Sequence, residues 1–212
     1  MKTYAKFIAC VGLGVLACAC APKEAEKAEP AACCTADAAI ENIMTRVSVR
    51  QYTDQPVEAE KVETILKAAM AAPTGGNAQP WEFIVVNDST TRAGLAEAMG
   101  GNGCVAGCQV VIIPCGNMDK KLGGEWGGFW SEDVSAATEN LLLAAHALGL
   151  GALWNGVYPV EDNVKNVSGF FNLPENIVPL AVITIGYPAE NPDVKDKWNT
   201  EKIHYNTYTA AE

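Results

Sequence analysis

Apolar residues recur along most of this chain with the spacing of amphipathic helices and buried strands. Between Val57 and Ala71 they fall every three or four residues, which predicts a helix that Pro73 ends. Short, nearly uninterrupted apolar runs predict buried strands instead. The same criteria predict further helices over 38–45, 90–99, 131–148 and 160–172, and strands over 82–86, 109–114, 152–157 and 178–185.

The helix expected over 131–148 is apolar on nearly every side, and Ser131 is its expected N-cap. A helix with this pattern is buried, and in a domain of this size a second subunit could supply part of the cover. His146 is then more often a hydrogen-bonded core residue than a catalyst. The tail from Gly186 to Glu212 has no core pattern of its own.

The N-terminus reads as an export signal. Two lysines precede an apolar run from Phe7 to Ala17, which is shorter than the ~20 residues of a membrane-spanning helix. The run ends in Val-Leu-Ala-Cys, which resembles a bacterial lipobox. We therefore expect a signal peptide over 1–17, lipidation at Cys18 with Cys20 as the fallback, and a flexible tether over 18–37. The alternative is ordinary secretion with cleavage after a small residue.

Composition limits the classes of function. The 212 residues suffice for one domain with a sizeable core, here expected over 38–212. The formal net charge of −10 argues against a nucleic-acid partner. Hydrolase motifs of the Gly-x-Ser-x-Gly and His-Glu-x-x-His types are absent from the sequence. The glycines near Asn102 precede a strand rather than follow one, so they do not form a dinucleotide fingerprint. Cys104 and Cys108 could form a disulfide or hold a metal, and Cys115 fits a core position.

Two polar segments carry the candidate chemistry. Arg46, Ser48 and Arg50 share one face of an extended segment and suit a phosphate, although a solvated basic turn would look the same. The loop from Pro73 to Trp81 sets hydroxyl and amide groups beside Gly75 and Gly76. Such a loop could read a flat heteroaromatic ring, or it could simply connect a helix to a strand.

Together these segments resemble the FMN-dependent nitroreductase family. The matching stretches are RVSVRQY, QPVEAEKVETILKAAMAAPTGGNAQPWEFIVV, ATENLLLAAHALGLGALWNG and IGYPAENPDVKDKW, and they cover about residue 40 to the C-terminus. Val47 and Thr74 depart mildly from the family pattern. The resemblance implies an α+β fold with a central mixed, mostly antiparallel sheet flanked by helices, and a homodimer that exchanges its C-terminal tails.

The resemblance also implies an enzyme that uses FMN. It assigns the phosphate and pyrimidine side of FMN to the segment with Arg46, Ser48 and Arg50 of one chain, here called the Arg segment. It assigns the ring to the Pro73–Trp81 loop of the other chain. Electrons would pass from NAD(P)H or another donor, in a ping-pong scheme, to a nitroaromatic, quinone or similar flat acceptor. Because the chain reads as exported and membrane-anchored, an electron-relay lipoprotein with little turnover is the alternative. The implied flavin contacts are Arg46, Val47, Ser48, Arg50, Pro73, Thr74, Asn77, Asn155, Gly156, Lys195 and Lys197.

Overall fold

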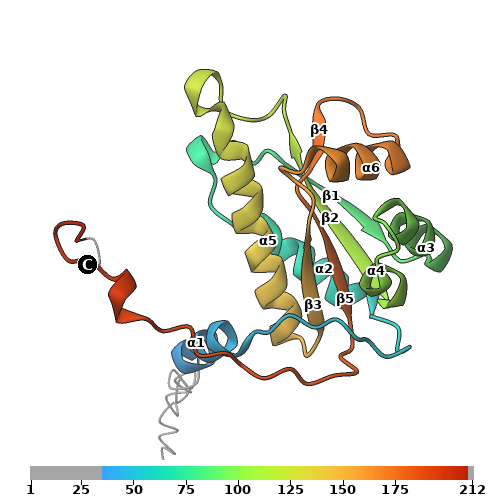
Figure 1. The fold of residues 1–212 in the computed structure, drawn as a ribbon, viewed down its shortest axis with the longest axis horizontal. Coiled ribbons are helices and arrows are strands. Elements are labelled where there is room, and N and C mark those ends of the chain that lie inside the picture. Colours follow the sequence, from blue (N-terminus) through green and yellow to red (C-terminus); the bar gives the residue numbers. More distant parts are fainter. Residues whose placement is uncertain (1–34, 210–212) are drawn as a thin grey trace, which may run out of the picture.

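The computed structural model describes residues 35–209, so the expected signal peptide and Cys18 lie outside the described residues. Five strands form one sheet in the order β1-β2-β5-β3, with β4 beside β2 (Figure 1). Every strand pairing is antiparallel, and the isolated bridge between Ser48 and Ala152 is parallel. The strands are β1 Trp81–Val86, β2 Val110–Asn117, β3 Gly151–Gly156, β4 Ile177–Pro179 and β5 Ala181–Gly186.

Helices cover both faces of the sheet (Figure 1). Along β2, Val110 and Ile112 face one core, while Val111 and Ile113 face the other, because side chains alternate across a strand. The first core is closed by α2 Ala59–Met70 and α5 Trp130–Ala147. The second is closed by α3 Ser89–Ala98, α4 Gly103–Gly107 and α6 Glu161–Phe171. The expected α+β architecture is confirmed.

Two boundaries differ from the sequence prediction. Helix α1 spans Thr35–Thr45, so it takes up the last residues that we assigned to the tether. Ser131 is not the N-cap of α5, because a 3-10 helix over Gly124–Phe129 runs directly into it and Phe129 already has a helical backbone. An N-cap needs an extended backbone, which this junction does not offer.

Helix α5 is buried along one side only. Val134, Leu141 and Ala145 are fully buried against the sheet and α2, whereas Glu132 and Glu139 are exposed. We expected this helix to be buried on every side, but within a single chain it is buried along one side only. Ala136 and Ala144 are half-buried and pack against the same core.

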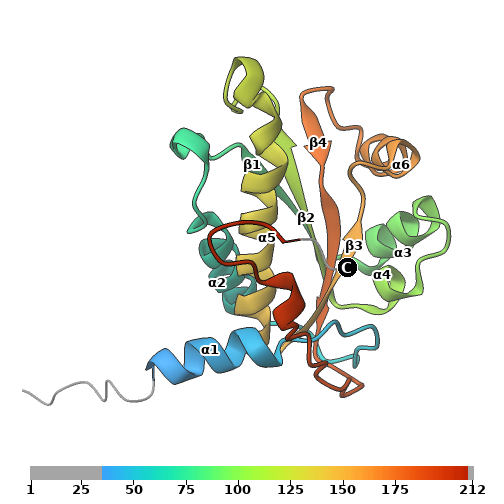
Figure 2. The ribbon, with the colours of Figure 1, turned by 60° about the vertical axis from the view of Figure 1, so that its left-hand side comes forward.

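The C-terminal tail leaves the body at the end where α1 lies (Figures 1 and 2). It contains a short 3-10 helix over Thr200–Lys202. Its aromatic side chains are strongly exposed, with 74% of Trp198 and 82% of Tyr205 accessible to solvent. Within residues 35–209, no helix is both long and apolar enough to cross a membrane.

Candidate functional site

The Arg segment lies along the edge of β3. Ser48 bridges Ala152, and the Val49 N–H donates to the Ala152 carbonyl at 3.1 Å. Gly151 makes this close approach possible, because a Cβ there would stand 2.7 Å from Val49 Cβ. The glycine thus sets the distance between the Arg segment and the sheet.

The two cations of this segment have different surroundings. The Arg46 Nε lies 3.4 Å from Glu139 Oε1 on α5, and the Arg46 side chain is 20% exposed. Arg50 is exposed, and its Nη1 reaches only the Ser48 carbonyl, at 3.5 Å. Within residues 35–209, Arg50 makes no salt bridge, so its charge is available to a bound anion.

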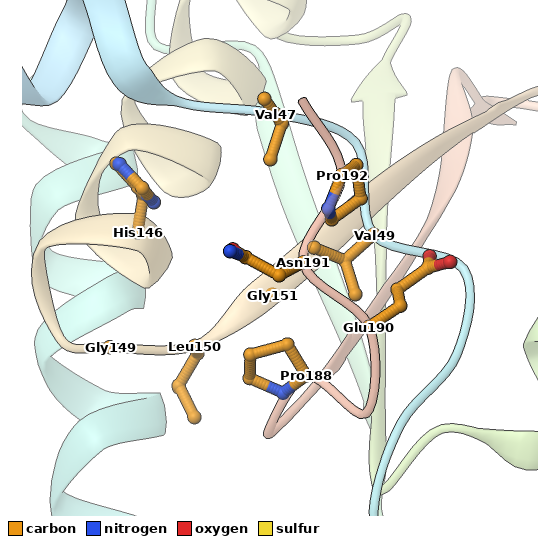
Figure 3. A pocket seen from close by; sticks show the side chains of 10 residues that line it. All are labelled: Val47, Val49, His146, Gly149, Leu150, Gly151, Pro188, Glu190, Asn191 and Pro192. Carbon is orange, nitrogen blue, oxygen red and sulfur yellow. The ribbon is translucent and has the colours of Figure 1, made fainter. Parts of the chain in front are cut away.

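Val47 and Val49 face the other way and line a half-open pocket of about 230 Å³ (Figure 3). The sequence placed Val47 among the flavin contacts, and the structure turns its side chain into this apolar pocket. His146 also lines the pocket, and its Nε2 lies 2.9 Å from Thr45 Oγ1. Burial, followed by the nearby Arg46 charge, lowers the pKa of His146.

The loop that follows α2 is held at the opposite end of α5. The Gly75 N–H donates to Asp133 Oδ1 at 2.8 Å, and the Gln79 N–H donates to Thr74 Oγ1 at 3.1 Å. Gly76, Asn77 and Gln79 all have positive φ. Backbone in this region is uncommon for residues other than glycine, and it concentrates at binding sites. Pro73 and Asn77 are exposed on this loop.

Within one chain, the Arg segment and this loop are far apart. Thr45, just before the segment, contacts His146, and the loop contacts Asp133, 13 residues earlier on α5. The Arg46 side chain reaches Glu139, between these two positions. At a helical rise of roughly 1.5 Å per residue, His146 and Asp133 are about 20 Å apart. Figure 1 shows the same separation, with α1 at one end of α5 and the loop at the other. A single chain does not bring the two predicted half-sites together.

Asn155 and Gly156 form the far end of β3. The Asn155 side chain is already engaged, since its Nδ2 donates to the Val182 carbonyl at 2.9 Å and its Oδ1 accepts from Asn102 Nδ2 at 3.1 Å. The backbone of both residues pairs with β5, and the Gly156 carbonyl also accepts from Asn163 Nδ2 at 3.4 Å. The backbone contact with the flavin ring that the resemblance implies for these two residues stays a prediction.

The remaining predicted residues are not gathered at the Arg segment. Lys195 and Lys197 lie on the exposed tail, and neither makes a salt bridge within residues 35–209. Two residues that our site prediction missed hold the site instead: Asp133 fixes the loop, and Glu190 accepts hydrogen bonds from the backbone at Arg50. Glu190 lies in the matching stretch IGYPAENPDVKDKW, but its contact with Arg50 could not be read from the sequence, because the two residues are 140 positions apart.

Neither interpretation of the cysteine pair is borne out. Cys104, Cys108 and Cys115 are all free thiols, and no metal-binding cluster occurs among the described residues. Burial raises the pKa of Cys108 to about 11 and that of Cys115 to about 12. Cys115 is a core residue, as expected.

Aromatic side chains surround the N-terminal end of α5. Trp130 is buried against Gly116 and packs edge-on against Tyr158, with the ring centroids 4.8 Å apart. Trp126 is 56% exposed and lies 5.6 Å from Phe129 between centroids. The aromatic group therefore combines a core residue with exposed rings that a flat molecule could contact.

Sequence and structure comparisons place the chain in a family. The model of the Nitroreductase family matches residues 43–107 and 104–187. A protein from Methanothermobacter thermautotrophicus, whose name proposes NADH dehydrogenase or NAD(P)H nitroreductase activity, is 43% identical over 78% of this chain and 85% of its own length. A structure from Parabacteroides distasonis with the same proposed activity has a TM-score of 0.76 at 40% identity, covering 81% of this chain and 99% of its own.

The name of a further solved structure states a cofactor. It is an FMN-dependent nitroreductase from Clostridium difficile, with a TM-score of 0.72 at 30% identity, covering 80% of this chain and 99% of its own. The antiparallel sheet, the helices on both faces and the matched segments define an oxidoreductase fold of this type. The chain belongs to the nitroreductase family and is an oxidoreductase of that family.

Proposed function

We propose that this protein is an FMN-dependent reductase that takes electrons from NAD(P)H. The observation that carries the proposal is the exposed, unpaired guanidinium of Arg50 beside Ser48 and Arg46. Guanidinium and hydroxyl groups suit both a phosphate and the electron-rich edge of a flavin. The donor set of this segment therefore fits FMN, and relatives named for FMN support the assignment.

The proposed site is shared between two chains. The Thr45 contact and the Gly75 contact stand about 20 Å apart along α5, with the Arg46 side chain between them at Glu139, so in this proposal one chain offers only part of the contacts to a given flavin. A two-fold related copy would bring the loop of one chain to the Arg segment of the other. Apolar side chains that solvent now reaches would be covered in such a dimer. Among the exposed apolar side chains of residues 35–209 we expect this for Ile40, Ile43, Met44, Met70, Trp198, Tyr205 and Tyr208.

Each half-site has a defined task in this proposal. Arg46, Ser48 and Arg50 bind the phosphate and pyrimidine side, and Lys195 and Lys197 of the tail add positive charge near the phosphate. The partner's copies of Pro73, Thr74 and Asn77 approach the ring, and the Asn155 and Gly156 backbone lines its edge. Fixed donors and cations at that edge stabilise negative charge that develops on the ligand. The chemistry that bound FMN supplies is hydride and electron transfer to a flat acceptor, such as a nitroaromatic or a quinone.

We also propose that the protein is exported and anchored to a bacterial membrane through a lipid at Cys18. The basic start, the short apolar run and the cysteine that follows it support this proposal. An exported reductase needs its flavin and its electron donor delivered to the same compartment.

Steady-state turnover tests the function. Purified protein that has been loaded with FMN should oxidise NADH or NADPH when a quinone or a nitroaromatic is supplied. Arg50→Ala should lower this rate at limiting FMN, and Glu161→Ala, on the exposed start of α6, is the matched control. A protein that binds FMN but oxidises neither nucleotide would be an electron relay instead.

A further inference from the structure

We propose that Glu190 is a positioning residue that holds the Arg50 backbone and keeps the Arg50 guanidinium available to the flavin. The proposal rests on the FMN-binding function proposed above. Glu190 is half-buried at the start of the tail and lines the pocket behind the Arg segment (Figure 3). Glu190 belongs to the matching stretch IGYPAENPDVKDKW, but the resemblance assigned no role to it.

Two consecutive N–H groups converge on one oxygen of Glu190. Its Oε1 accepts from the Arg50 N–H at 2.5 Å and from the Gln51 N–H at 3.2 Å. Successive backbone N–H groups that point to one spot form an anion-binding concavity. In this protein the chain's own carboxylate fills that concavity.

This arrangement separates the carboxylate from the neighbouring cation. Glu190 forms its hydrogen bonds with the backbone of Arg50, whereas the Arg50 Nη1 points to the Ser48 carbonyl. A salt bridge between Glu190 and the guanidinium would neutralise the charge that a flavin needs. Because the backbone satisfies the carboxylate, the Arg50 cation is left for an external anion.

Glu190 is also the last link between the Arg segment and the tail. Residues 51–53 pair with residues 187–189 of the tail through an isolated bridge between Tyr52 and Pro188. The Thr53 N–H donates to the Tyr187 carbonyl, and the Ala189 N–H donates to the Gln51 carbonyl, both at 2.9 Å. Beyond Glu190 the chain is largely exposed. The carboxylate therefore fixes the point at which the tail departs, directly beside Arg50.

Equilibrium binding of FMN to the full-length, flavin-free protein tests this role, with quenching of flavin fluorescence as the signal. Glu190→Ala should raise the Kd by about tenfold, because two charge-assisted hydrogen bonds are lost. Glu190→Gln keeps an acceptor oxygen and should stay within about threefold of wild type. Asp193→Ala is the control for removing one negative charge from the tail.

A double-mutant cycle separates positioning from support of the fold. If Glu190 acts through Arg50, then Glu190→Ala should cost less than about threefold in an Arg50→Ala background. An equal tenfold loss in both backgrounds would overturn the proposal, as would a Glu190→Ala protein that binds FMN as tightly as wild type or more tightly. A wild-type chain that takes up no FMN would instead overturn the flavin function itself, and this inference with it.

Discussion

Asp133, in the first turn of α5, accepts a hydrogen bond at 2.8 Å from the backbone N–H of Gly75. Asp133 is only 7% exposed, and its partner lies 58 residues earlier in the chain. The contact joins a loop with positive φ at Gly76, Asn77 and Gln79 to α5, the longest helix within residues 35–209. The start of that helix also favours a negative charge through its dipole. The geometry of the predicted ring-binding loop therefore depends on one buried carboxylate.

Removing that carboxylate should loosen the loop. Asp133→Ala leaves the Gly75 N–H without its partner, and we expect a loss of about 1.5–3 kcal/mol in the free energy of unfolding. FMN affinity should fall at the same time, because Asn77 and its neighbours lose their fixed backbone. Urea denaturation and FMN titration measure the two effects. Glu132→Ala, at the exposed neighbouring position, is the control and should change both by little. Unaltered FMN binding in Asp133→Ala would show that the loop does not contact the flavin.

Gly151 should not tolerate a methyl group. A Cβ at this position would meet three Val49 atoms at 2.7–2.8 Å, so Gly151→Ala must push the Arg segment away from β3. We expect lower stability and weaker FMN binding, both visible by thermal unfolding with and without FMN. Gly169→Ala is the matched control, because nothing lies within 4 Å of its would-be Cβ in α6. That change should be neutral or stabilising by up to about 1 kcal/mol, since alanine favours a helix. A Gly151→Ala protein as stable as the control would contradict the close contact.

The free energy of unfolding should depend on pH through His146. Burial lowers its pKa in the folded chain below the ordinary value of 6.5. The unfolded chain therefore binds the proton more readily, so protonation favours unfolding. Stability should be unaffected by this group above pH 6.5 and should decline as the pH falls below it. Urea unfolding of wild type and His146→Gln across pH 5–8 tests this, with a smaller decline expected for the variant. Parallel pH profiles for the two proteins would show that His146 does not contribute.

The N-terminus should carry a lipid at Cys18. Expression in a bacterial host that processes lipoproteins, followed by mass spectrometry of the N-terminal peptide, should show a diacylglyceryl mass. Cys18→Ser should abolish the modification and release the protein from the membrane fraction. A lipid that persists in Cys18→Ser would assign the modification to Cys20. An intact Met1, or a cleaved and unmodified terminus, would refute the anchor.

Local sequence patterns predicted most of the fold, because hydrophobic periodicity reflects which side of an element is buried. The apolar run after Gln109 became the central strand β2, and the helix predicted over 90–99 became α3, which Asp88 caps through the Thr91 N–H. The prediction that Ser131 is the N-cap of α5 was wrong, because the preceding 3-10 helix continues into α5 without a break.

The candidate site was only partly predictable. Arg50 and Ser48 lie on one extended segment, so their proximity follows from the sequence. Two contacts hold the site. Asp133 contacts Gly75, 58 residues away in the sequence, and Glu190 contacts Arg50, 140 residues away. Such contacts arise from the packing of the whole domain, which single-sequence periodicity does not encode. The separation of the two half-sites along α5 likewise became visible only in three dimensions.

Central to the proposed function is that FMN binds between two chains, with the Arg segment from one and the loop from the other. Size-exclusion chromatography with light scattering and flavin absorbance tests it directly, on protein saturated with FMN at low micromolar concentration. We predict a dimer with one FMN per chain, and loss of both dimer and flavin when the tail from Asp193 onward is deleted. A monomer that still holds one FMN per chain would contradict the shared site, and a protein that takes up no FMN would contradict the flavin assignment.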